Sequence, residues 1–231
     1  MHHSVSLRQK NRRFLLSVLL FAAVTAIIGE TAVLAADRET VLVIDPGHGG
    51  LDGGAVSADG IEESGINLAV SERVYALCQL FGIPACMTRD SETLDYPAEA
   101  VTIHDKKLWD QKRRAELVNS YEAAILLSIH QNMYPDPRPS GSQVYYGKCE
   151  GSTEFGTLLH DNLIRHLCPG NRRVAAPISD RIYLLKAVRC PAVLAECGFL
   201  SNPEEAVKLS DGSYQTALAA VIFASYLQYI S

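Results

Sequence analysis

The chain has 231 residues, of which 48% are hydrophobic and 20% are charged, and its formal net charge is −5. This length is typical of one globular domain with additional segments. The acidic balance argues against a nucleic-acid-binding protein, because contacts with phosphates need clustered lysines and arginines, and the basic clusters of this chain are short.

The first 36 residues have the pattern of an export segment. An uncharged apolar run at 14–28 is followed by the small residues Val33-Leu34-Ala35, which suit a signal peptidase, and it is preceded by the basic residues Arg8, Lys10, Arg12 and Arg13. The run is shorter than the roughly 20 residues of a bilayer-spanning helix, which favours a cleaved signal peptide. The alternative is an uncleaved membrane anchor over residues 1–36. In both cases we expect residues 40–231 to work outside the cytoplasm.

Downstream of this segment, short apolar runs alternate with longer helical patterns. The predicted strands are residues 41–45, 83–87, 123–130, 142–146, 182–185 and 192–196. The predicted helices are residues 67–81, 105–119, 153–167, 203–209 and 214–230. This alternation predicts a single α/β domain with a largely parallel twisted sheet flanked by helices. The polar stretch 89–104 and the proline-rich segment 134–142 are expected to be surface loops.

Six cysteines occur, at positions 78, 86, 149, 168, 190 and 197. Outside the cytoplasm an even number of cysteines permits disulfides. A domain of this length can bury a sufficient core without them, however, and a free thiol in an apolar stretch behaves as a small hydrophobe. Mostly free cysteines are therefore the simpler interpretation, and the absence of a CxxC pair argues against a thiolate zinc site.

The first predicted strand leads into the glycine-rich turn Asp45-Pro46-Gly47-His48-Gly49-Gly50. The turn fits neither of the common phosphate-binding motifs, GxxxxGK[ST] and GxGxxG. The glycines instead allow a sharp turn that holds His48 at the carboxyl edge of the sheet, where ligands of open α/β sheets bind. A lone histidine after a strand is more often structural, so His48 becomes a candidate only in combination with other residues.

Such residues occur at two other places. His130 ends the central apolar strand at the corresponding edge, and Glu62-Glu63 precedes a predicted helix. Two imidazoles and one carboxylate suit zinc and leave its fourth position for water. Glu196 ends another apolar strand, where a charge is costly unless it has a partner or a function. The remaining histidines, His104, His160 and His166 among them, have no comparable setting.

Four blocks of sequence together resemble the zinc-dependent N-acetylmuramoyl-L-alanine amidases, in the branch that contains spore-cortex and cell-division enzymes. The blocks are residues 43–50, 60–63 with Asn67-Leu68, 128–132, and 191–203. They occur in the order of the family and cover the chain from about residue 41 to its end. The chain departs from the family pattern at Ser64-Gly65, where relatives usually carry a lysine and an acidic residue.

The resemblance implies a ligand set and a mechanism. His48, Glu63 and His130 would hold Zn²⁺, with Glu63 preferred over Glu62, and Glu196 would be the catalytic carboxylate that accepts the proton of the attacking water and returns it to the leaving nitrogen. Arg114 matches a family arginine, for which a structural ion pair is the favoured interpretation. The implied reaction is hydrolysis of the amide between N-acetylmuramic acid and L-alanine in peptidoglycan, in spore cortex or in cell-wall remodelling.

Two alternatives to this reaction stay open. A zinc peptidase acting on the stem peptides of peptidoglycan would use the same metal ligands. A non-catalytic wall-binding regulator would keep the fold, although we would expect it to have lost Glu196 or a ligand. The resemblance also leaves room for a membrane tether through the N-terminus and for a regulatory protein partner.

Overall fold

The structure, a computed structural model, describes residues 40–179 and 182–231. Residues 40–231 form one compact unit. The export segment predicted at residues 1–36 lies outside the described residues. No helix in the described part of the chain is both long and apolar enough to cross a bilayer.

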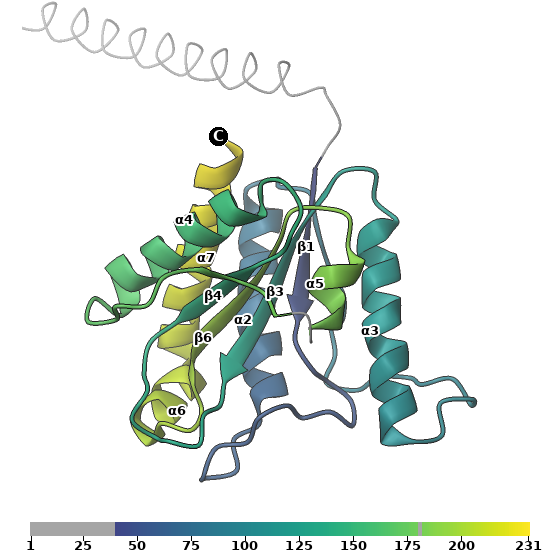
Figure 1. Ribbon diagram of the computed structural model, residues 1–231, viewed down its shortest axis with the longest axis horizontal. Helices are drawn as coiled ribbons and strands as arrows, with labels where there is room; N and C mark the ends of the chain where they lie inside the picture. The colour runs from purple at the N-terminus through teal and green to yellow at the C-terminus, as the bar shows by residue number, and fades with distance from the viewer. Residues whose placement is uncertain (1–39, 180–181) are drawn as a thin grey trace, which may run out of the picture. The chain divides into compact units, whose positions relative to one another are not determined.

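A six-stranded sheet with the order β2-β1-β3-β6-β4-β5 forms the centre of this unit (Figure 1). The strands are β1 (Val41–Pro46), β2 (Ala85–Met87), β3 (Ala124–Asn132), β4 (Gln143–Tyr146), β5 (Ala176–Pro177) and β6 (Ala192–Phe199). β1 pairs in parallel with β2 and β3, and β3 pairs in parallel with β6. β4 runs antiparallel to β6 and parallel to β5. The prediction of a largely parallel sheet is therefore confirmed.

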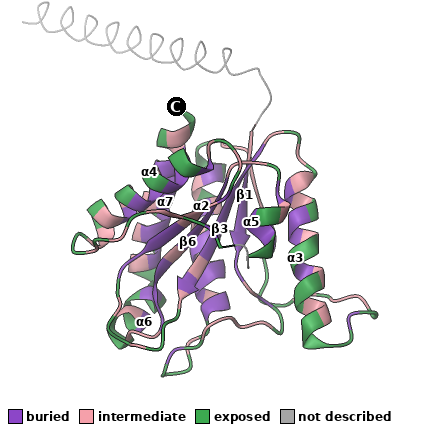
Figure 2. Cartoon of the chain, viewed as in Figure 1, coloured by how far each residue is buried: buried purple, intermediate pink, exposed green. Residues whose placement is uncertain are grey.

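Helices cover both faces of the sheet, and the central strands β1, β3 and β6 are mostly buried (Figure 2). The helices are α2 (Glu63–Leu80), α3 (Ile103–Asn119), α4 (Ser152–Leu167), α5 (Tyr183–Ala187), α6 (Pro203–Ser210) and α7 (Gly212–Ile230). The larger apolar cluster joins α2, α4, α6 and α7 to one face, and the smaller cluster joins α3 and α5 to the other. All six cysteines are free thiols in this arrangement.

Two predicted elements differ from the structure, and one short strand of the structure has no predicted counterpart. The apolar run at 182–185 was predicted to be a strand, but Tyr183–Ala187 forms the short helix α5. A run of four apolar residues has no period that separates a strand from a buried helical turn, so tertiary packing decides. The helix predicted from residue 67 begins instead at Glu63. The two-residue strand β5 was not predicted, because it is too short to show an alternating pattern.

The alternation of side chains along β3 and β6 places the candidate residues. Leu126 and Leu194 pack under α3 and α5, and residues two positions apart on a strand face the same side. Ser128 and His130 lie two and four positions after Leu126 on β3, and Glu196 lies two positions after Leu194 on β6. Because His130 and Glu196 are directly paired in the parallel ladder, their side chains stand side by side on this face.

Candidate active site

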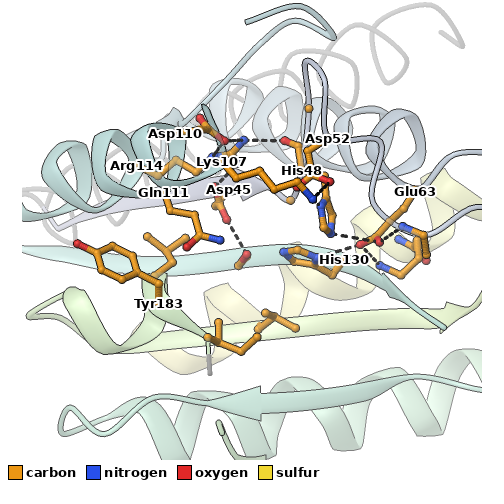
Figure 3. A pocket seen from close by; sticks show the side chains of 18 of the residues that line it. Asp45, His48, Asp52, Glu63, Lys107, Asp110, Gln111, Arg114, His130 and Tyr183 are labelled. Carbon is orange, nitrogen blue, oxygen red and sulfur yellow. Dashed lines mark hydrogen bonds and ion pairs between the residues drawn. The ribbon is translucent and has the colours of Figure 1, made fainter. Parts of the chain in front are cut away.

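A cavity of about 330 Å³ opens at the carboxyl ends of β1, β3 and β6, on the face that α3 and α5 cover. Figure 3 shows Tyr183 and Gln111 toward one end of this cavity and His130 with Glu63 toward the other. The polar lining comes from the loop after β1, the first turn of α2, the strand β3 and the helix α3. Segments that are distant in sequence therefore contribute to one polar site.

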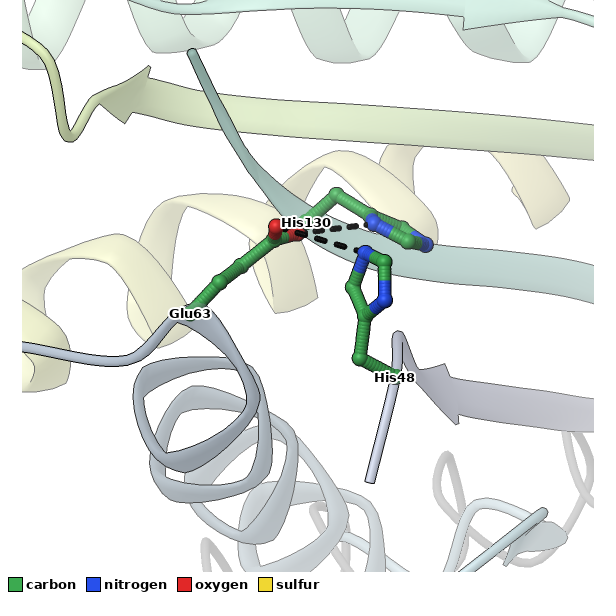
Figure 4. Close-up of side chains that lie close together, drawn as sticks. All are labelled: His48, Glu63 and His130. Atoms are coloured by element: carbon green, nitrogen blue, oxygen red, sulfur yellow. Dashed lines mark hydrogen bonds and ion pairs between the residues drawn. The ribbon is translucent and has the colours of Figure 1, made fainter. Parts of the chain in front are cut away.

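Three candidate ligands converge at one end of the cavity (Figure 4). His48 comes from the loop after β1, Glu63 is the first residue of α2, and His130 lies near the end of β3. One nitrogen of each histidine and a carboxylate oxygen of Glu63 lie within 4.8 Å of one another. His48 Nε2 is 3.3 Å from Glu63 Oε2, and His130 Nδ1 is 2.9 Å from Glu63 Oε1.

This spacing fits a zinc ion. Tetrahedral coordination with bonds of about 2.0 to 2.1 Å separates two ligand atoms by roughly 3.3 Å, and two imidazoles with one carboxylate are a common catalytic donor set. The surrounding backbone is glycine where the ligands need space. A Cβ at Gly47 would collide with the ring of His130, and a Cβ at Gly54 would lie 2.6 Å from Glu63 Oε2.

Asp52 orients the ring of His48. Its Oδ2 lies 3.0 Å from His48 Nδ1, which leaves Nε2 facing Glu63, and Lys107 Nζ lies 2.8 Å from its Oδ1. Burial alone lowers the pKa of His48, but hydrogen bonds to Asp52 and Glu63 outweigh it and raise this pKa to about 9. A carboxylate on the far nitrogen of a histidine is a usual partner of a metal ligand.

The carboxylate of Glu63 is held by several donors. Its Oε2 accepts from the backbone N–H of Ala55 at 2.9 Å. Its Oε1 accepts from the backbone N–H of Gln131 at 3.0 Å and from Asn67 Nδ2 at 3.1 Å. Burial alone would raise the pKa of Glu63, but hydrogen bonds with His130 and His48 outweigh it and lower this pKa. Glu63 is thus kept ionised, as a metal ligand must be.

Glu196 stands beside His130 with a free carboxylate oxygen. Its Oε2 is buried and meets no hydrogen-bond partner among the residues that the structure describes. Burial raises the pKa of Glu196 to about 7, although the nearby His130 acts in the opposite direction. Buried carboxylates without a partner are uncommon, and strongly shifted pKa values in a cavity are typical of functional groups.

Arg114 forms the buried ion pairs expected of a structural residue. It is 3% exposed, and its guanidinium lies 2.8 Å from Asp45 Oδ1 and 2.7 Å from Asp110 Oδ2. It also donates to the backbone carbonyl of His48 at 2.6 Å. The ion pair favoured for Arg114 is therefore present, and its hydrogen bond to the carbonyl of His48 also links α3 to the loop after β1.

The structure brings His48, Glu63, His130 and Glu196 together, as the sequence predicts. It places Glu62 on the surface, at the N-cap of α2. His104 and His166 are exposed. His160 is fully buried in α4, and neither of its ring nitrogens is hydrogen-bonded within residues 40–179 and 182–231. Sequence reasoning missed Asp52, although a carboxylate four residues after a candidate ligand histidine is a signal for such a partner.

Comparisons with known proteins agree with this geometry. Residues 42–226 match the N-acetylmuramoyl-L-alanine amidase family Amidase_3. The germination-specific N-acetylmuramoyl-L-alanine amidase of Bacillus subtilis is 37% identical over 192 residues, which are 83% of this chain and 80% of that protein.

Two solved structures have the same fold. The CwlD amidase from Clostridioides difficile, in complex with the GerS lipoprotein, is 33% identical with a TM-score of 0.79, over 83% of this chain and 98% of that one. AmiC2 of Nostoc punctiforme, also an N-acetylmuramoyl-L-alanine amidase, is 26% identical with a TM-score of 0.71, over 83% and 97%. These likenesses favour the amidase over both a stem-peptide peptidase and a non-catalytic regulator. The chain belongs to the N-acetylmuramoyl-L-alanine amidase family and is an amidase that acts on peptidoglycan.

Proposed function

We propose that this amidase depends on zinc, which His48, Glu63 and His130 hold, and that Glu196 is its general base and general acid. The observation that carries the proposal is the convergence of the three ligand atoms within 4.8 Å beside the paired strand residue Glu196. When bound, zinc polarises a carbonyl oxygen and lowers the pKa of a water toward 7, which supplies a nucleophile near neutral pH.

The protein's own residues then divide the remaining work. Asp52 keeps His48 turned toward Glu63, and Asn67 with the backbone of Gln131 keeps Glu63 turned toward the histidines. Glu196 accepts the proton of the attacking water at its unpartnered oxygen while the new C–O bond forms. It returns that proton to the alanine nitrogen as the C–N bond breaks, so the carboxylate is regenerated.

The neighbouring glutamates provide a matched test of the ligand set. Glu63→Gln should lose most of the bound zinc, because a neutral amide is a much poorer ligand than a carboxylate and Glu63 is buried in the cluster. Glu62→Gln, one residue away and exposed, should bind zinc like the unchanged protein. Metal content after dialysis, measured by atomic emission on folded protein, distinguishes the two variants.

The ligand assignment would be contradicted if the two variants had the same zinc content, or if Glu62→Gln held less zinc than Glu63→Gln. If Glu63→Gln retained one tightly bound zinc per chain, Glu63 would not be a ligand. If Glu62→Gln lost its zinc while Glu63→Gln kept it, the assignment would move to Glu62. Circular dichroism of both variants checks that a lost metal is not simply a lost fold.

We place the enzyme in spore-cortex modification. Support comes from the germination-specific amidase of Bacillus subtilis, which is 37% identical and of similar extent. A regulatory protein partner belongs to the same proposal, because the solved CwlD amidase is in complex with a lipoprotein. Digestion of purified cortex peptidoglycan, with mass analysis of the released ends, should give muramic acid residues freed of L-alanine.

We also propose that residues 1–36 direct export, with cleavage favoured over a retained membrane anchor. Peptidoglycan lies outside the cytoplasm, so an amidase acting on it must reach that side. Residues 1–40 fused to a reporter that is active only outside the cytoplasm should give a signal. N-terminal sequencing of the mature protein should find a start near Ala36 or Asp37. An intact N-terminus on exported protein would replace cleavage with anchoring, and a silent reporter would contradict export.

A further inference from the structure

We propose that Arg89 is a positioning residue that fixes the separation of His48 and Glu63 and thereby sets the zinc affinity of the site. The inference rests on the zinc site proposed above and adds a residue outside the ligand set. Arg89 follows β2, in the stretch that the sequence predicts to be a surface loop, yet it is only 4% exposed. Its position is therefore a correction to that prediction.

The guanidinium of Arg89 links two ligand-bearing segments through their backbone. It donates to the carbonyls of Pro46 and Gly47, both at 3.0 Å, directly before His48. It also donates to the carbonyl of Ser64 at 2.8 Å, directly after Glu63. A fourth bond, to the carbonyl of Ser91 at 3.0 Å, holds the arginine to its own loop. One rigid planar group thus spans the loop of His48 and the first turn of α2.

The chemistry of this contact favours a geometric role. In the described part of the chain the four hydrogen bonds of Arg89 all go to backbone carbonyls, so its direct contacts hold backbone and not a carboxylate. Burying a charge is costly, which makes an incidental placement improbable. Arginine offers five N–H donors in a fixed plane, whereas lysine offers three from a single flexible point. Only this planar fork of guanidinium N–H donors can hold four carbonyls in defined directions.

The backbone that Arg89 holds is strained. His48 has a φ of 61°, in the left-handed region that residues other than glycine rarely adopt. Such a conformation persists only where its surroundings impose it. Arg89 holds the two carbonyls before His48, and Arg114 holds the carbonyl of His48 itself. Close packing adds to this, since a Cβ at Gly49 would lie 2.8 Å from Arg89 Nε.

Removing the fork should therefore loosen the ligand geometry more than the fold. Asn67 also bridges the two segments, through Gly47 O at 3.1 Å, so the loop stays attached to α2 without Arg89. The strained turn at His48 then has fewer constraints, and its imidazole samples positions that do not suit a metal shared with Glu63. Loss of such outer contacts typically weakens metal affinity by about 10- to 100-fold.

Two variants of Arg89 and one control test the inference. Arg89→Lys keeps the charge and loses the planar fork, and Arg89→Gln loses both but keeps a donor. The control is Arg73→Lys, on the same helix as Glu63, where the arginine donates to the carbonyl of Ala69 and the hydroxyl of Thr216 away from the cavity. The full chain is used after metal removal. Competition with a chromophoric chelator gives the zinc dissociation constant, and urea unfolding gives the stability of the metal-free protein.

We expect both Arg89 variants to bind zinc about 10- to 100-fold more weakly, and Arg73→Lys to bind it within about twofold of the unchanged protein. The affinity is measured where circular dichroism shows each variant to be folded, so reduced stability alone cannot produce the shift. Folded Arg89 variants with unchanged zinc affinity would overturn the positioning role, whatever their stability. Retention of zinc by Glu63→Gln would instead overturn the zinc site itself, so the two failures are distinguishable.

Discussion

Glu196→Gln is expected to leave the fold and the bound zinc intact and to reduce turnover by about 10²- to 10⁴-fold, the usual contribution of a general acid or base. The amide keeps the size of the side chain but cannot accept the proton of the attacking water. Zinc should remain, because Glu196 lies outside the cluster of His48, Glu63 and His130. Turnover is measured as the release of L-alanine-ended stem peptides from peptidoglycan, with zinc content and thermal midpoint determined on the same preparation.

A purely structural role of Glu196 makes a different forecast. If the carboxylate stabilised a buried cation, its replacement would lower the stability by about 3 to 5 kcal/mol and leave turnover nearly normal in the folded fraction. The structure speaks against this, because no partner of the buried Glu196 Oε2 occurs in the described part of the chain. Removing an unpartnered charge that burial disfavours should leave the thermal midpoint unchanged or raise it.

Glu205→Gln is the matched control for this experiment. Glu205 is a partly buried carboxylate near the end of β6, where it accepts from the backbone N–H groups of Gly141 and Phe199. Its replacement should lower stability and leave zinc content and turnover close to those of the unchanged protein. A folded, zinc-loaded Glu196→Gln enzyme with unchanged turnover would refute the general base proposed here.

The positions at strand ends are the part of the site that the sequence can predict. His48, His130 and Glu196 each follow or end an apolar run, and parallel strands bring their carboxyl ends to one edge of the sheet. The choice of Glu63 over Glu62 is harder, because both stand before the predicted helix. The structure starts α2 at Glu63 and leaves Glu62 at the N-cap, with an extended backbone and an exposed side chain, so of the two only Glu63 faces the histidines.

The sequence does not predict the residues that hold the ligands in place from outside the ligand set. Arg89 and Asp52 lie in polar or glycine-rich stretches, where a charged residue is usually solvated. Their partners are backbone carbonyls and a histidine ring that only the folded chain brings near. The mistaken strand at 182–185 has a related cause, because α5 packs against α3, which is distant in sequence. The local sequence pattern therefore predicts neither the contacts of Arg89 and Asp52 nor the helix at 182–185.

The largest effect on stability is expected from Arg114→Met. This change removes the arginine partner of buried Asp45 and the nearer of the two arginine partners of Asp110, and removal of one partner from a buried ion pair typically costs about 3 to 5 kcal/mol. Arg113→Met, one residue away, is the control. Arg113 is partly exposed and lies 3.2 Å from Asp110 Oδ1, and it donates to the carbonyl of Thr88 at 3.0 Å, so its replacement should cost about 1 kcal/mol, well below the cost at Arg114. Urea unfolding of the metal-free proteins at neutral pH measures both values.

The pH dependence of the Arg114→Met defect identifies its cause. Burial alone raises the pKa of Asp45, but Arg114 and hydrogen bonds from Ser128 and Thr88 outweigh it and lower this pKa to about 2. In the unchanged protein Asp45 therefore stabilises the fold above its unfolded pKa near 4, and this contribution disappears as the pH falls toward 2. Without Arg114, burial holds the pKa of Asp45 higher. The variant therefore loses stability at neutral pH and regains it as Asp45 takes up a proton.

The difference in unfolding free energy between the two proteins should accordingly narrow between pH 7 and pH 4. Asp45→Asn combined with Arg114→Met should cost less than the sum of the two single changes. A gap that stays constant over this range would mean that lost packing of the arginine, and not the orphaned carboxylate, causes the defect.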